Sequence, residues 1–193
     1  WAQLDKEFTA KLAAAAAKGG QIRIVSNSIL SPTTKKVIAE FTAKYPTTQH
    51  VVYDANPAYG LTQAHGGVLP NIDFSQAKTI VSVDADFLNS WLLSTEYTGQ
   101  YALTRNPDAA WMSKHIQFET VMSVTGSNAD YRGMIKPSEQ ANVLAYILGK
   151  FGVNAGVSSA LPKEAQVVAD QAVKALKASK GMSVVVSGSN NKA

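Results

Sequence analysis

Two aspartates separated by one residue form the first candidate site in the sequence. Asp84 and Asp86 directly follow the strand-like run Thr79–Val83. An α/β sheet binds its ligands beyond the carboxyl ends of its strands, and an Asp-x-Asp pair can hold Mg²⁺ when a phosphate-binding partner is also present. The competing interpretation is structural, because one of the aspartates could cap the segment 87–93 by accepting hydrogen bonds from its backbone N–H groups.

Other patterns that could support catalysis or metal binding are weak. His115, Gln117 and Glu119 alternate along a strand-like segment and therefore share one face. The ends of this row lie about 13 Å apart by strand rise, which is too far for one metal ion. Gly66 and Gly67 lack the spacing of a dinucleotide-binding or Walker loop, so we expect them in a tight turn. No Gly-x-Ser-x-Gly sequence is present, which disfavours a hydrolase.

Composition narrows the classes of function. The 193 residues are 46% hydrophobic, enough to line the core of one domain. The chain has no cysteine, so it cannot itself hold disulfides, thiolate metal sites or iron–sulfur clusters. The net charge of +4 is scattered over several predicted helices, which argues against a nucleic-acid partner. The longest apolar run, Leu12–Ala17, is far shorter than the roughly 20 residues of a membrane helix, so we expect no direct membrane insertion.

The elements that would position these residues alternate between strand and helix. Short β-branched runs predict strands at Ile22–Val25, Val51–Tyr53, Thr79–Val83, His115–Thr120 and Ser183–Val186. Apolar periodicity and cap signals predict helices at Leu4–Ala17, from Pro32 after the N-cap Ser31, near Trp91 and 96–104, after a cap at Ser138, and at Pro162–Ser179. A short helix is expected inside the long loop 56–71, and 123–131 reads as a polar loop.

This alternation predicts the fold class. Strands separated by helices of about ten or more residues are typical of an α/β fold. We expect three layers, with a mostly parallel, Rossmann-like sheet covered by helices on both faces. Residues 1–193 are expected to form a single domain, and because the chain begins with Trp1 and ends just after a strand-like run, we expect it to be a fragment of a longer chain.

Two longer runs of sequence are informative: TIVSVDADFLNSW at residues 79–91 and TGSNADYRGMIKPSEQ at residues 125–140. On these runs, residues 73–148 resemble the molybdopterin oxidoreductase family. In the second run, Thr125-Gly126 resembles the Thr-Ala pair of the family, Ala129-Asp130 its Ala-Asp pair, and Ile135-Lys136-Pro137 its Ile-Arg-Pro sequence. The implied fold is again a Rossmann-like α/β domain.

The sequence departs from the family where the family holds its pterin guanine dinucleotide. Asp84-Ala85-Asp86 replaces Gly-x-Asn, Glu119-Thr120-Val121 replaces Asp-Pro-Arg, and Ser138-Glu139-Gln140 replaces Gly-Thr-Asp. By resemblance, the degenerate cofactor-binding positions are therefore Asp84, Asp86, Glu119 and Gln140. Carboxylates here would repel a pyrophosphate, and an amide offers guanine one acceptor oxygen where an aspartate offers two. We expect no cofactor, no bound metal and no catalytic residue in this segment.

One branch of the family, the iron–sulfur subunit of alternative complex III, has lost the cofactor in the corresponding region. Its sequence is similar to ADFLNSW at residues 85–91 and SVTGSNADYR at residues 123–132. The resemblance implies a non-catalytic scaffold domain in a quinol-oxidising respiratory complex, periplasmic and associated with the membrane through that complex. The implied partners are the other subunits and an iron–sulfur domain of the same chain, which would carry the clusters used in electron transport.

Two alternatives remain open at the level of sequence. The chain could be a fragment of an active oxidoreductase that binds two molybdopterin guanine dinucleotides. It could also be a stand-alone, Mg²⁺-dependent enzyme that acts on a nucleotide or sugar phosphate through Asp84 and Asp86. The fold alone does not separate these functions, because one α/β architecture supports many kinds of site.

Overall fold

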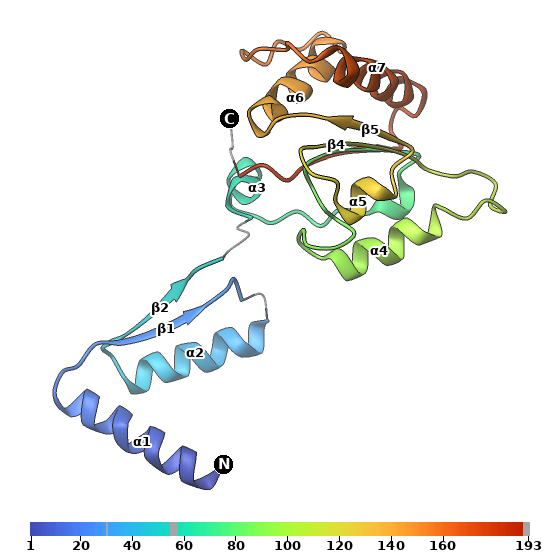
Figure 1. The fold of residues 1–193 in the computed structure, drawn as a ribbon. Helices are drawn as coiled ribbons and strands as arrows, with labels where there is room; N and C mark the ends of the chain where they lie inside the picture. The colour runs from blue at the N-terminus through green and yellow to red at the C-terminus, as the bar shows by residue number, and fades with distance from the viewer. Residues whose placement is uncertain (30, 55–57, 191–193) are drawn as a thin grey trace. The chain divides into compact units, whose positions relative to one another are not determined.

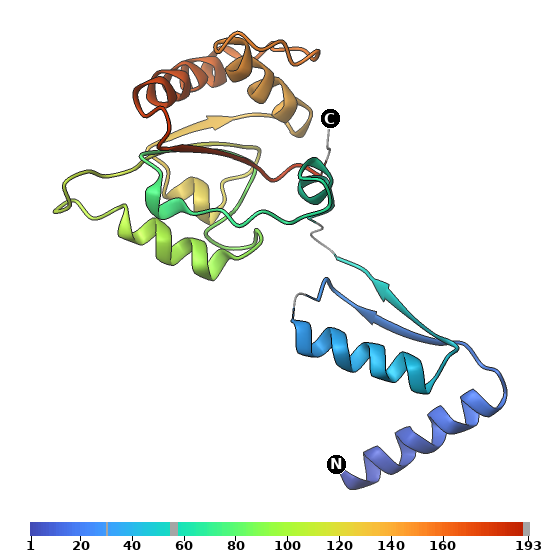
Figure 2. The ribbon, with the colours of Figure 1, turned by 180° about the vertical axis from the view of Figure 1, so that it is seen from behind.

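A computed structural model describes residues 1–29, 31–54 and 58–190 (Figures 1 and 2). Contacts divide the chain into two compact units, 1–57 and 58–193. The expectation that residues 1–193 form a single domain stays a prediction.

The first unit is a parallel βαβ motif preceded by a helix. Its elements are α1 (Ala2–Ala17), β1 (Ile22–Ser26), α2 (Pro32–Lys44) and β2 (Thr48–Val52). β1 and β2 pair in parallel, with Ile22 opposite Thr48. The hydroxyl of Ser31 accepts a hydrogen bond from the backbone N–H of Thr34 at 3.4 Å, and Pro32 occupies the first turn. The predicted start of this helix is therefore confirmed.

The second unit contains a four-stranded parallel sheet with the strand order β5-β4-β3-β6. Its strands are β3 (Thr79–Val83), β4 (Lys114–Glu119), β5 (Tyr131–Met134) and β6 (Ser183–Ser187). Its helices are α3 (Tyr59–Ala64), η1 (Phe74–Gln76), α4 (Ser94–Leu103), α5 (Val124–Ser127), η2 (Pro137–Glu139), α6 (Gln140–Gly149) and α7 (Lys163–Ala178).

Helices cover both faces of this sheet, which confirms the three-layer α/β prediction. In Figure 1, α6 and α7 lie on one side of the strands and α4 and α5 on the other. On the first side, Val81 and Phe118 belong to a core cluster that includes residues of α6 and α7. On the second side, Ile80 belongs to a cluster with Phe74 and Tyr97. Thr79–Val83 is buried along its whole length, as a central parallel strand should be.

Three local expectations were wrong. The segment 87–93 forms turns rather than a helix, and α4 begins only at Ser94. Ser138 does not cap a helix, because it lies inside η2, where the Glu139 carboxylate instead accepts a hydrogen bond from the backbone N–H of Lys136 at 2.8 Å. The polar segment 123–131 contains the short helix α5 and leads directly into β5.

The strand β5 was missed because its sequence carries little strand signal. Of its four residues only Tyr131 favours a strand, and the others include an arginine and a glycine. Pairing with β4 explains the glycine, since a Cβ at Gly133 would lie 2.7 Å from the ring of Phe118. The strand conformation of β5 therefore depends on pairing with β4 more than on the propensities of its own residues.

Among the residues described in the two units, no helix is long and apolar enough to cross a membrane.

Candidate functional site

The four positions singled out from the sequence lie at the carboxyl edge of the second unit's sheet. Asp84 and Asp86 follow β3, Glu119 is the last residue of β4, and Gln140 is the first residue of α6. Gln140 Nε2 donates to Asp84 Oδ2 at 2.6 Å. The structure therefore brings Asp84 and Gln140 into direct contact, although 56 residues separate them in the sequence.

Asp84 occupies a conformation that few side chains adopt. Its φ is +56°, in the left-handed region. Gly188 lies against its main chain, and a Cβ at Gly188 would overlap the Asp84 carbonyl oxygen. Burial raises the pKa of Asp84, the nearby charge of Glu119 raises it further, and the hydrogen bond from Gln140 acts in the opposite direction. The position of the Asp84 carboxylate is thus set by an unusual backbone conformation, and its pKa by burial and by the neighbouring Glu119 and Gln140.

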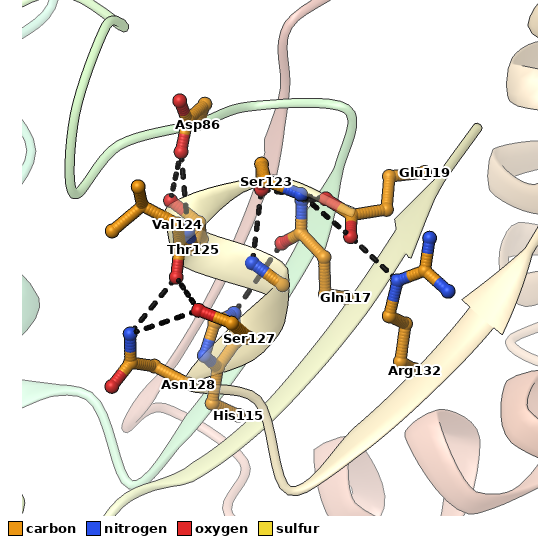
Figure 3. Close-up of polar contacts among 11 residues, drawn as sticks. Asp86, His115, Gln117, Glu119, Ser123, Val124, Thr125, Ser127, Asn128 and Arg132 are labelled. Carbon is orange, nitrogen blue, oxygen red and sulfur yellow. Dashed lines mark hydrogen bonds and ion pairs between the residues drawn. The ribbon is translucent and has the colours of Figure 1, made fainter. Parts of the chain in front are cut away.

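Asp86 binds a different part of the protein (Figure 3). Its Oδ1 accepts hydrogen bonds from the backbone N–H of Thr125 at 3.1 Å and from the Thr125 hydroxyl at 2.7 Å. Its Oδ2 accepts from the side chains of Asn89 at 3.0 Å and Ser90 at 3.1 Å. Burial acts to raise the pKa of Asp86, but these hydrogen bonds outweigh it and the pKa is lowered. Asp86 is therefore a carboxylate stabilised in its charged form.

The hypothesis that an aspartate side chain caps the segment 87–93 is wrong, because among the described residues the backbone N–H groups of this segment do not donate to a carboxylate. The backbone N–H groups of Asn89, Ser90 and Trp91 donate to the main-chain oxygen of Asp86, at 3.1, 2.9 and 3.0 Å. The Asp86 carboxylate instead takes a backbone N–H from α5, 39 residues further along the chain. Asp84 and Asp86 thus direct their carboxylates to different elements, α6 and α5, rather than jointly to one position.

Glu119 is almost fully buried, with 1% of its surface exposed, and is saturated with hydrogen bonds (Figure 3). Its carboxylate accepts from Ser123 N at 3.2 Å and Ser123 Oγ at 2.6 Å, and forms an ion pair with Arg132 Nε at 2.6 Å. Gly126 makes this approach possible, since a Cβ there would overlap the Glu119 carboxylate. A buried charge of this kind is tolerated only because its oxygens are paired.

A row of buried polar side chains leads along β4 to Glu119, as the alternating pattern predicted. Tyr101 OH lies 3.2 Å from His115 Nδ1, and His115 Nε2 lies 3.3 Å from Gln117 Oε1. Gln117 Nε2 donates to Glu119 Oε2 at 3.3 Å. Because the amide nitrogen of Gln117 faces Glu119, its oxygen faces His115, which assigns the imidazole proton to Nε2. Burial lowers the pKa of His115 to about 4, so its ring is neutral near pH 7.

A second ion pair closes the other end of this row. Arg105 donates to both carboxylate oxygens of Asp130, each at 2.8 Å, and Asp130 also accepts the backbone N–H of His115 at 2.7 Å. Burial acts to raise the pKa of Asp130, but the hydrogen bonds from Arg105 and from the His115 backbone outweigh it and lower the pKa. The amino end of the polar row is thus attached to a charged pair near the surface.

Sequence reasoning missed the residues that hold these carboxylates. Ser123 could have been found, because a serine just before a short helical turn is an N-cap signal, and its hydroxyl accepts from Gly126 N at 2.9 Å. Thr125 and Arg132 carried no local signal, since their partners lie on other elements.

The chemistry available to this arrangement is limited. The hydroxyl of Ser123 accepts a hydrogen bond from Gly126 N and donates to Glu119, whose carboxylate is itself paired with Arg132, so the hydroxyl holds the start of α5 in place. In the described part of the chain, no group of three or more His, Cys, Asp or Glu side chains is placed to hold a metal ion. The polar side chains thus bind one another and the backbone, which is the pattern of a structural network.

No protein-family model matches the chain, and none of the curated proteins shows significant similarity to it.

Proposed function

We propose that this chain is a non-catalytic scaffold domain of a molybdopterin oxidoreductase-like, iron–sulfur electron-transfer protein. The observation that supports this proposal is the internal pairing of Asp84, Asp86, Glu119 and Gln140. By resemblance, these positions correspond to contacts of a pterin guanine dinucleotide. Here each of these four side chains forms hydrogen bonds with other residues of the same chain.

The two carboxylates that face α5 already accept hydrogen bonds from the backbone N–H groups that a phosphate would need as donors. Glu119 accepts the backbone N–H of Ser123, and Asp86 accepts that of Thr125. A phosphate at the same place would meet two negative charges at short range. It would also have to displace hydrogen bonds whose loss leaves buried polar groups unpaired, at a cost of about 1–3 kcal/mol for each group. These residues therefore do not fit a pyrophosphate.

Gln140 is equally unsuited to reading guanine. An aspartate can accept from both N1–H and N2–H₂ of the base, whereas an amide has a single acceptor oxygen. The amide nitrogen of Gln140 already donates to Asp84. With its nitrogen held there, Gln140 offers guanine only the single acceptor oxygen of its amide.

The properties of the whole protein are proposed from the resemblance. The clusters and the redox chemistry would belong to another domain of the same polypeptide, which agrees with the absence of cysteine here. The domain would contribute packing surface inside a periplasmic, membrane-associated respiratory complex that oxidises quinol.

Calorimetric titration with GMP and GDP, each with and without Mg²⁺, tests the proposal. We expect no binding heat at millimolar nucleotide, for the intact chain and for Asp84→Asn alike. Micromolar binding without metal would overturn the proposal in favour of a working cofactor domain. Binding that requires Mg²⁺ and is lost in Asp84→Asn, but kept in the exposed charge control Asp108→Asn, would instead favour the stand-alone enzyme.

A further inference from the structure

The strand β6 ends the four-stranded sheet and leaves one set of its main-chain groups without a neighbouring strand. Lys78 N donates to Met182 O at 2.7 Å, and Gly188 N donates to Val83 O at 2.9 Å, so the even-numbered residues of this stretch face β3. Main-chain groups alternate sides along a strand, so Val185 and Ser187 direct their N–H and C=O groups to the opposite edge. Among the described residues, no strand pairs with that edge.

An apolar groove of about 650 Å³ follows this free edge. Residues 184–187 of β6 form its floor, with Ala141 and Leu144 of α6 as one wall and Ile72 and Trp91 as the other. The helix α3 also borders the groove, through Leu61 and Ala64. The two walls belong to opposite faces of the sheet. No Asp, Glu, Lys or Arg among the described residues lines the groove, in a chain whose residues are 17% charged. Its chemistry therefore suits an uncharged occupant with apolar groups on two sides.

The dimensions of the groove match one additional strand. The groove follows four residues of β6, and a four-residue strand between two covering layers takes up about 630 Å³, from a rise of ~3.3 Å per residue, a strand spacing of ~4.8 Å and a layer spacing of ~10 Å. Strands of parallel sheets are normally buried on both faces, yet Val185 is 45% exposed, while Val186, which belongs to the core cluster of Phe74 and Tyr97, is 5% exposed. Burial of this edge is thus incomplete where a further strand would complete it.

We propose that the free edge of β6 is a binding site for an extended, uncharged polypeptide strand with apolar side chains on both faces. The strand adds to the sheet as a fifth member. Its main chain pairs with Val185 and Ser187, and its side chains enter the two apolar walls. Main-chain pairing supplies affinity and the walls select side chains, as in other cases of strand addition. The groove meets the paired carboxylates at Gln140, which lines it, but the inference does not rest on the proposed function.

A labelled peptide with the sequence of residues 79–83 is the probe, because these uncharged residues already pair with the other edge of β6. We expect it to bind the intact chain in a fluorescence anisotropy titration. Val185→Pro removes an N–H that β3 does not use, so the sheet should persist, as circular dichroism would verify. The variant should bind the peptide about tenfold more weakly, the effect of one lost hydrogen bond. Val185→Thr, which keeps the N–H, should bind like the unmodified chain.

Two further measurements keep the proposal falsifiable even if Val185→Pro fails to fold. A peptide N-methylated at alternate residues cannot pair and should not bind the intact chain. Amide exchange at Val185 should slow when the unmodified peptide is added, while exchange at Val184 stays unchanged because that residue faces β3. Absence of peptide binding, or equal binding of the N-methylated peptide, would overturn the proposal. So would a Val185 amide already protected in the chain alone, or dimerisation that Val185→Pro abolishes, which would identify a second copy as the occupant.

Discussion

The two faces of β4 achieve burial by different means. On one face Ile116 and Phe118 pack among apolar side chains of the α6 and α7 side. On the other face His115, Gln117 and Glu119 are buried to the same extent, with 1% or less of their surface exposed. The first face depends on shape and apolar area, and the second on directed hydrogen bonds that end in an ion pair with Arg132.

This difference shows what a buried polar row contributes. Apolar contacts tolerate substitutions that conserve volume, whereas each polar side chain has a donor and an acceptor direction that must be satisfied. The row therefore determines where α5 and its preceding loop lie, because Ser123 must reach Glu119. The apolar face mainly supplies stability, and the polar face determines which segments meet at the carboxyl edge.

The largest effect on stability is expected for Gly126→Ala, which disrupts the hydrogen bonds on the polar face of β4. The added Cβ would overlap the Glu119 carboxylate, so that group would have to leave its partners on Ser123 and Arg132. We expect a loss of about 5 kcal/mol in the free energy of unfolding, from overpacking together with a disrupted buried charge. Urea denaturation measures it. The matched control is Gly99→Ala in α4, where a Cβ meets nothing within 4 Å, and it should be neutral or slightly stabilising. Equal effects of the two substitutions would contradict the role assigned to Glu119.

Phe118→Ala on the apolar face should have the next largest effect. Its ring is fully buried in the core cluster, and truncation of a buried phenylalanine costs about 4 kcal/mol. Ile116→Val on the same face removes one methylene and should cost about 1 kcal/mol. The loss should be the same at pH 7 and pH 5, because no titratable group of the polar row is altered. A strongly pH-dependent loss in urea denaturation would show that the two faces are not independent.

A smaller effect than that of Phe118→Ala is expected from the pH dependence that the polar face should confer. The pKa of His115 is about 4 in the folded chain, below the ordinary value of 6.5, so the unfolded chain binds a proton more readily. Stability should therefore fall by up to about 3 kcal/mol as the pH drops from 6.5 to 4. Below this range the lowered pKa values of Asp86 and Asp130 would add a further loss, whereas the raised pKa of Asp84 acts in the opposite direction.

Denaturation midpoints of the chain and of His115→Gln, compared across this pH range, test the assignment. The variant should be less stable at pH 7 but should lack most of the decline between pH 6.5 and 4. An identical decline in both proteins would show that some other group titrates.

Local sequence determined most of the secondary structure and one feature of the site. Strands such as Thr79–Val83 carry β-branched residues, and the alternation from His115 to Glu119 is enough by itself to put three polar side chains on one face. Ser31 and Pro32 predicted the start of α2 in the same way, from the preferences of individual residues at the first turn of a helix. These features depend on propensity and periodicity within a few residues, which a sequence displays directly.

Tertiary structure alone decided which partners the carboxylates have. Asp86 pairs with Thr125, Asp84 with Gln140 and Glu119 with Arg132, in each case across elements that only the packed sheet brings together. The strand β5 was also decided by tertiary structure, because the ring of Phe118 on β4 leaves no room for a Cβ at position 133. A hydrogen bond requires two atoms within about 3 Å, and a distance of that kind between distant residues is set by the packing of whole elements, which local sequence patterns do not encode.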